Sequence, residues 1–159
     1  MFCIVAVDKN HGIGHAGGLL IHLSGDLRYF KEQTLGKTVV MGYHTLLSLP
    51  HSAPLKGRRN IVLTSKDISI EGAEVCHSVD EVLELVKGEA PDSVAVIGGG
   101  LVYREMLPYC DRVLATEIEA IWDADTYFPE LDGFSLVSRS EKQEENGIAY
   151  TFCVYERNR

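Results

Sequence analysis

Residues 12–45 read GIGHAGGLLIHLSGDLRYFKEQTLGKTVVMGYHT, and this stretch decides the fold. A glycine-rich segment leads into a helical pattern that carries the carboxylate Asp26, and a short apolar run follows and ends at Gly42. A helix that leads into a buried strand is typical of α/β folds. The order also puts one acidic side chain between two glycine-containing segments that could approach a nucleotide.

Outward from this stretch, short apolar runs alternate with helical patterns. Continuous apolar runs suit strands that are covered on both faces, and alternation with helices implies right-handed crossovers in a mostly parallel sheet. Ser78 precedes Glu81 by three residues, which is the capping signature of a helix. We predict strands at residues 2–8, 37–42, 59–64, 73–77, 93–100 and 112–119, and helices at 25–35, 43–49, 79–87 and 101–107.

Two segments depart from this alternation. Residues 133–141 and 148–156 are separated by a polar, glutamate-rich turn without a helix, which predicts an antiparallel hairpin at the edge of the sheet. Residues 12–20 hold four glycines, too many for a regular element, and we predict a mobile loop that covers a site.

Composition and charge exclude several classes of protein. The chain has 159 residues, of which 45% are hydrophobic, enough for one domain over residues 1–159 and too few for two. Its formal net charge of −8 would repel polyanions, so we expect no nucleic-acid partner. No apolar run is long enough to span a bilayer, so we expect no membrane partner either.

The cysteines are widely separated along the chain. They lack the paired spacing of a metal site and the density of a disulfide-stabilised secreted protein. We therefore predict buried thiols, no metal and a cytoplasmic location. The four residues are Cys3, Cys76, Cys110 and Cys153.

Asp26 has two interpretations from its surroundings. An acid in the first turn of a helix complements the helix dipole, which needs no further function. However, Leu27 and Phe30 should face the interior beside it, and a carboxylate among apolar side chains is costly unless it is hydrogen-bonded. Such a group could bind a flat, amidine-like heterocycle through two parallel hydrogen bonds.

Two glycine-containing segments could meet a nucleotide. VIGGGLVY, residues 96–103, follows an apolar run and opens a helix, so its N–H groups could face an anion, although three glycines can also be a tight turn. It lacks the spacing G-x-G-x-x-G of the dinucleotide fingerprint. In MGYHT, residues 41–45, Thr45 could donate to a phosphate or cap the helix.

The motifs of this chain resemble those of the dihydrofolate reductase family in order and spacing. They are residues 12–45, PLKGRRNIVLTS (54–65), VIGGGLVY (96–103), ATEIEA (115–120) and DADTYFP (123–129). The resemblance covers nearly the whole chain. It implies a single-domain α/β fold with a central eight-stranded, mostly parallel sheet, an antiparallel C-terminal hairpin and four flanking helices. It also implies the reduction of 7,8-dihydrofolate to 5,6,7,8-tetrahydrofolate by hydride transfer from NADPH, in one-carbon metabolism.

The resemblance implies roles for individual residues. Asp26 matches the carboxylate that binds the pterin 2-amino group and N3 and favours protonation of N5, and Thr116 matches the hydroxyl that orients it. Arg58 matches the guanidinium that clamps the glutamate α-carboxylate, although beside Arg59 it could be part of a solvated pair. The other substrate positions, several of which would be core residues in any fold, are Val5, Ala6, Leu27, Phe30, Leu49, Ile97 and Tyr103.

The resemblance also implies a cofactor site, with a cis peptide between Gly98 and Gly99. Its positions are Ala6, Ile13, Gly14, Gly18, Leu19, Gly42, Tyr43, His44, Thr45, Leu63, Thr64, Ser65, His77, Gly99, Gly100, Leu101, Val102, Tyr103 and Thr126.

The chain departs from the family before the first helix. Leu20-Ile21 replaces a common Pro-Trp, and Ser24 stands where a second Pro is common. Ile21 cannot donate to the water that the Trp indole binds, a loss on the order of 1 kcal/mol. We expect a slower enzyme that is less sensitive to diaminopyrimidine antifolates. Equal inhibition of the protein and its Leu20→Pro/Ile21→Trp variant would contradict the second expectation.

The cofactor site departs as well, because Tyr43 and Leu101 stand where the family has Arg. The 2′-phosphate of NADPH is then left with mostly neutral candidate ligands, namely His44, His77, Thr64 and Ser65. We expect NADPH with weaker discrimination against NADH than usual, and a large NADPH preference in kcat/KM would contradict this.

Two other functions stay open. A related reductase fold acts on a ribosylamino-pyrimidine in riboflavin synthesis, but we would not expect it to carry GDLRYFK with an acid at this place. A non-catalytic paralogue could bind a pterin or nucleotide without turnover. In each case we expect a monomer.

Overall fold

One large sheet runs through the molecule, in a computed structural model that describes residues 1–15, 18–19 and 23–159. Its strands are β1 (Phe2–Val7), β4 (Thr38–Gly42), β5 (Arg59–Leu63), β6 (Ala73–Cys76), β7 (Val94–Gly98), β8 (Arg112–Ile118), β10 (Phe134–Arg139) and β12 (Ile148–Arg157). They lie in the order β10-β12-β8-β1-β7-β4-β5-β6. All pairs from β8 to β6 are parallel, and β12 is antiparallel to both β8 and β10. The predicted eight-stranded, mostly parallel sheet is confirmed.

Four helices of the described part of the chain flank this sheet, within one or two residues of the predicted bounds. They are α1 (Ser24–Thr34), α2 (Tyr43–Ser48), α3 (Val79–Leu85) and α4 (Gly100–Met106), and three short 3₁₀ turns lie at Pro50–Ser52, Pro91–Ser93 and Leu107–Tyr109. The predicted cap of α3 is present, because Ser78 Oγ accepts from Glu81 N at 3.1 Å. Glu81 Oε2 in turn accepts from His77 N at 2.6 Å, one residue before the N-cap N–H that the Glu of a capping box binds.

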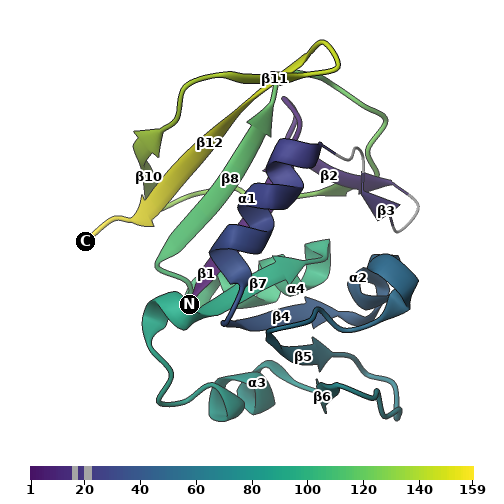
Figure 1. Ribbon diagram of the computed structural model, residues 1–159. Coiled ribbons are helices and arrows are strands. Elements are labelled where there is room, and N and C mark those ends of the chain that lie inside the picture. Colours follow the sequence, from purple (N-terminus) through teal and green to yellow (C-terminus); the bar gives the residue numbers. More distant parts are fainter. Residues whose placement is uncertain (16–17, 20–22) are drawn as a thin grey trace.

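Alternation along the strands separates the core into two layers. Odd-numbered residues of β1 pack with α3 and α4, and even-numbered residues pack with α1 and α2. Thr116 of β8 is therefore on the face that α1 covers, because Leu114, two residues before it, packs in the same layer as Phe2 and Ile4. Figure 1 shows α1 lying across this face, in front of β1 and β8.

The predicted mobile loop at residues 12–20 is wrong for the part that the structure describes. Gly12–His15 forms β2 and Gly18–Leu19 forms β3, which join β9 (Thr126–Tyr127) in a second sheet of order β3-β2-β9. Thr126 pairs with Gly14 from a distant part of the chain, and this tertiary pairing overrides the low strand propensity of glycine. The predictions for Leu20 and Ile21 lie outside the described residues.

The polar turn before β12 contains a further short strand. β11 (Gln143–Glu145) pairs with β12, and Glu145 lies opposite Ile148. Asn146 and Gly147 between them have φ angles of 54° and 78°. Two central residues with positive φ define the type I′ hairpin turn, for which Asn-Gly is the strongest short-range signal.

The four cysteines are free and buried, as predicted. Burial raises the pKa of the Cys153 thiol to about 11, so it is an unreactive, protonated group at neutral pH. None of the described helices combines the length and the apolar character that a bilayer crossing requires.

Candidate active site

Asp26 is held against the sheet by a side chain from β8. Thr116 is 1% exposed, and its Oγ1 donates to Asp26 Oδ1 at 2.5 Å. Burial raises the pKa of the Asp26 carboxyl, and the hydrogen bond from Thr116 opposes that rise. A dipole partner at a helix N-terminus needs neither burial nor such a bond, so this geometry favours a functional acid.

Apolar side chains from three elements lie on the same face as Asp26. Phe30 of α1, Ile97 of β7 and Leu49, which follows α2, pack in one cluster. Leu27 does not face the interior as we expected, because it is 47% exposed. A position one residue from Asp26 is turned by about 100° around the helix, which brings its side chain out to solvent.

The contact predicted between Val5 and the substrate stays a prediction, and the structure shows only where the Val5 side chain lies. Val5 packs in the layer of α3 and α4, on the face of β1 that lies opposite Asp26. Ile4 and Ala6 lie on the face of α1.

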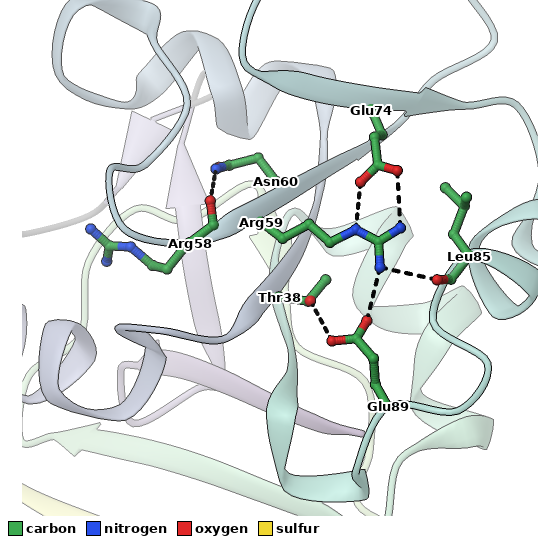
Figure 2. A network of polar contacts seen from close by, with 7 residues as sticks. All are labelled: Thr38, Arg58, Arg59, Asn60, Glu74, Leu85 and Glu89. Atoms are coloured by element: carbon green, nitrogen blue, oxygen red, sulfur yellow. Dashed lines mark hydrogen bonds and ion pairs between the residues drawn. The ribbon is translucent and has the colours of Figure 1, made fainter.

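Arg58 and Arg59 point in opposite directions (Figure 2). Arg58 Nη1 donates to Thr34 Oγ1 at 3.1 Å, at the C-terminal end of α1, and Arg58 Nε donates to Lys56 O at 2.9 Å. Burial lowers the pKa of this guanidinium, which nevertheless stays charged. Among residues 1–15, 18–19 and 23–159, no carboxylate forms an ion pair with Arg58, so it is available to an anionic ligand.

Arg59 is part of a structural network instead. Its guanidinium binds both oxygens of Glu74, at 2.5 and 2.9 Å, and reaches Glu89 at 3.1 Å and Leu85 O at 3.0 Å. Glu89 also accepts from Thr38 Oγ1 at 2.7 Å (Figure 2). These contacts join β4, β5, β6 and the segment after α3, so the pair is not simply solvated.

The predicted cofactor residues at the ends of β4 and β7 come together. Gly42 occupies the N-cap position of α2, and no side chain forms a capping hydrogen bond there. Thr45 is therefore not the cap. Thr45 Oγ1 instead lies 3.3 and 3.4 Å from where a Cβ would stand on Gly98 and Gly99. The peptide between these two glycines is cis, as expected.

The second sheet meets the same glycines. A Cβ on Gly100 would lie 2.6 Å from Thr126 Cγ2, and Thr126 pairs with Gly14. Gly14, Gly100 and Thr126 are therefore neighbours. Tyr103 is 4% exposed and donates from its hydroxyl to Ile4 O at 2.7 Å, so that hydroxyl is occupied.

Other predicted cofactor residues differ in what they offer a ligand. Ile13 and Val102 pack in the core layer of α4, whereas His44 and Leu101 are exposed. Gly18 and Leu19 lie in β3. Leu63 ends β5 and leads into Thr64 and Ser65.

Sequence reasoning missed Lys66, which lies among the predicted phosphate ligands. Its Nζ is 5.8 Å from the centroid of the Tyr43 ring, and its backbone N–H donates to Thr64 Oγ1 at 3.2 Å. His77 Nδ1 lies 2.8 Å from Thr64 O. Although position 43 has no arginine, the segment that follows β5 places the cation of Lys66 near Tyr43. An exposed Lys two residues after Thr64 was the available signal.

The predicted cofactor residues Gly42, Leu63 and Gly99 lie at the carboxyl ends of β4, β5 and β7, where open α/β sheets bind ligands. A cavity of about 400 Å³ lies at the other ends, lined by residues that include Met1, Val94 and Asp111. It is remote from Asp26 and takes no part in this site.

Comparison with known proteins agrees with this geometry. The family model described as dihydrofolate reductase matches residues 1–157. The dihydrofolate reductase of Bacillus subtilis is 39% identical over 159 residues, which cover 97% of this chain and 92% of that protein. Dihydrofolate reductase type 3 of Salmonella typhimurium is 38% identical, over 98% of this chain and 97% of that protein. 

A solved structure is similar as well. Dihydrofolate reductase from Enterococcus faecalis, complexed with NADP(H) and RAB-propyl, superposes with a TM-score of 0.90 at 36% identity. The match covers 99% of this chain and 96% of that one. The chain belongs to the dihydrofolate reductase family.

Proposed function

We propose that this protein reduces 7,8-dihydrofolate to 5,6,7,8-tetrahydrofolate with NADPH, and that Asp26 is its acidic group. The observation that carries the proposal is the Asp26 carboxyl, partly buried and bonded to Thr116, beside the apolar side chains of Phe30 and Ile97. The 2-amino group and N3 of a pterin form a flat pair of donors, which a carboxylate binds through two parallel hydrogen bonds.

The surroundings of Asp26 suit proton delivery. Its raised pKa lets the carboxyl hold a proton closer to neutral pH than an exposed Asp does, and this favours protonation of pterin N5. Thr116 positions the group, because its donation to Oδ1 restricts rotation of the carboxyl.

The residues present fit a dinucleotide. Gly99 lies beside Thr45 and Gly100 faces Thr126, and both glycines are partly exposed, so a ligand can approach their main chain. These residues would hold the pyrophosphate and nicotinamide. When bound, NADPH supplies the hydride for the reduction.

Arg58 would hold the other end of the substrate. It lies at Thr34, eight residues after Asp26 on α1, which corresponds to about 12 Å along the helix axis. An extended ligand with a heterocycle at one end and a carboxylate at the other matches this arrangement, because a guanidinium binds a carboxylate bidentately.

A direct assay separates this function from the alternatives. NADPH oxidation is measured with dihydrofolate and with the ribosylamino-pyrimidine of riboflavin synthesis. Turnover of dihydrofolate alone supports the proposal, whereas turnover of the pyrimidine alone would assign the related reductase. A protein that binds dihydrofolate without oxidising NADPH would be the non-catalytic paralogue.

Lys66 leads to a prediction about the choice of cofactor. The variant Lys66→Gln should lower kcat/KM for NADPH by about tenfold and leave NADH unchanged, because only NADPH carries the 2′-phosphate. Steady-state kinetics with both cofactors measure this. Lys87→Gln, at an exposed lysine in the turn after α3, is the control and should change neither value. An equal fall with both cofactors would exclude phosphate recognition by Lys66.

We extend the proposal to a cytoplasmic monomer without a nucleic-acid partner. The formal net charge of −8 supports the last part. Four free, buried cysteines suit a reducing compartment.

A further inference from the structure

Helix α1, which carries Asp26, begins without a side-chain cap from its own N-cap residue. Its N-cap residue is Leu23, which is 2% exposed and offers no side-chain hydrogen bond. The first N–H groups of a helix have no partner within the helix and must find one elsewhere. Here Ser24 N donates to Glu145 Oε2 at 2.8 Å, and Gly25 N donates to Glu145 Oε1 at 3.2 Å.

The backbone of Glu145 is fixed by the hairpin of β11 and β12. Glu145 pairs with Ile148 directly across the Asn146-Gly147 turn. A two-residue turn with positive φ at both positions sets the register of its strands. Glu145 therefore reaches α1 from a rigid support, about 120 positions away in the sequence.

The first turn of α1 also lies directly against β12. A Cβ on Gly25 would stand 2.1 Å from Tyr150 Oη, and Tyr150 is 4% exposed, so its ring has little room to move. Four residues further along α1, the Tyr29 ring stacks on Phe152 with 4.1 Å between centroids. Phe152 pairs across the sheet with Thr116.

We propose that Glu145 is a positioning residue for Asp26, acting as the N-cap that α1 lacks and holding its first turn against β12. The inference rests on the proposed function of Asp26. Thr116 fixes the carboxyl from the sheet, and Glu145 fixes the backbone that carries it. Ser24 makes the two-pronged cap possible, because the Pro common at this position in the family has no N–H.

Kinetics on Glu145 variants test the positioning role. Glu145→Ala should lower kcat/KM for dihydrofolate by about fivefold, since the loss of a cap loosens the first turn, and should leave the KM for NADPH unchanged. Glu145→Gln keeps an acceptor and should lose less. The matched control is Glu144→Gln, an exposed neighbour on β11 that should behave as wild type. Equal changes in both substrates, or none, would overturn the role.

Ser24→Pro tests the contact without breaking the helix, because Pro is well tolerated at the first helical position. It removes one of the two donors to Glu145, so Glu145→Ala should have a smaller effect on kcat/KM in this background than in wild type. Effects of the two substitutions that simply add would show that Glu145 acts on Asp26 by another route.

Amide hydrogen exchange separates this inference from the proposed function. Leu27 N donates to Leu23 O at 2.9 Å in the first turn, and Leu35 N donates to Lys31 O at 2.9 Å in the last. In Glu145→Ala, exchange at Leu27 should become faster while exchange at Leu35 stays constant. Unchanged exchange at Leu27 would refute the cap whether or not the enzyme turns over. Faster exchange with unchanged kcat/KM would refute the positioning of Asp26, and an inactive wild type would refute the proposed function.

Discussion

The variant Asp26→Asn should lose about a hundredfold or more of kcat with dihydrofolate at neutral pH. Asn has the shape of Asp, and its Oδ1 can still accept from Thr116, so the fold should be retained. It has no proton to offer and cannot bind the pterin 2-amino group and N3 as a charged fork. NADPH oxidation by wild type and variant measures the loss, and a variant with more than a tenth of wild-type kcat would remove Asp26 from the mechanism.

The pH dependence follows from the raised pKa of Asp26. As pH rises through that pKa, the protonated fraction of the carboxyl falls, so the wild-type rate should fall with it. The plateau should extend to higher pH than the pKa of an exposed Asp would allow. Asp26→Asn should lack this titration, and an identical pH profile in the variant would assign the titration to another group.

The same shift makes stability depend on pH, and stability falls with rising pH as activity does. The folded protein binds the Asp26 proton more tightly than the unfolded chain, so this group lowers the free energy of unfolding as pH rises above its unfolded pKa. Asp26→Asn should therefore have a higher Tm than wild type at pH 8, and the difference should shrink toward about pH 4. A Tm gain that does not depend on pH would show that burial of the charge is not its cause.

The variant Arg58→Leu should raise the KM for dihydrofolate by about 10- to 100-fold, as expected for losing hydrogen bonds between two charged groups. Its kcat should change little, because Arg58 binds at Thr34, far from Asp26 on the same helix. Arg58→Lys should recover only part of the loss, since an ammonium cannot form the bidentate pair. A dihydropterin without the glutamate should not distinguish the variants from wild type.

Arg59→Leu is the matched control for Arg58. Arg59 is bound to Glu74 and Glu89, so its loss should lower Tm while the KM for dihydrofolate stays at the wild-type value. The effect on Tm should be small, because ion pairs that are this exposed contribute about 1 kcal/mol or less. Equal KM effects at both positions would mean that the two arginines act together as a cationic surface.

Apolar patterning predicted the large sheet and its helices because the buried strands are continuous apolar runs that alternate with helical patterns, and α3 also carries its cap signature in the sequence. The second sheet was not predictable in this way, since Gly12 and Gly14 have low strand propensity and their partner is β9, far along the chain.

The residues that sequence reasoning did not find depend on contacts between distant segments of the chain. Position-by-position resemblance brought Asp26, Thr116 and Arg58 together, because the family keeps those residue types at those places. It could not find Lys66 or Glu145. Only the folded structure shows that Lys66 lies close to the Tyr43 ring. Glu145 reaches α1 only because the Asn146-Gly147 turn sets the hairpin register.

The position of β12 inside the sheet has a consequence for synthesis on the ribosome. β8 has β1 on one side and β12 on the other, so a nascent chain that stops before residue 148 exposes an unpaired edge at β8. Residues 148–157 form β12, which pairs with that edge. Tyr150 and Phe152 within β12 contact the first turns of α1. The acid group is translated early, but its surroundings can be completed only when nearly the whole chain has left the ribosome.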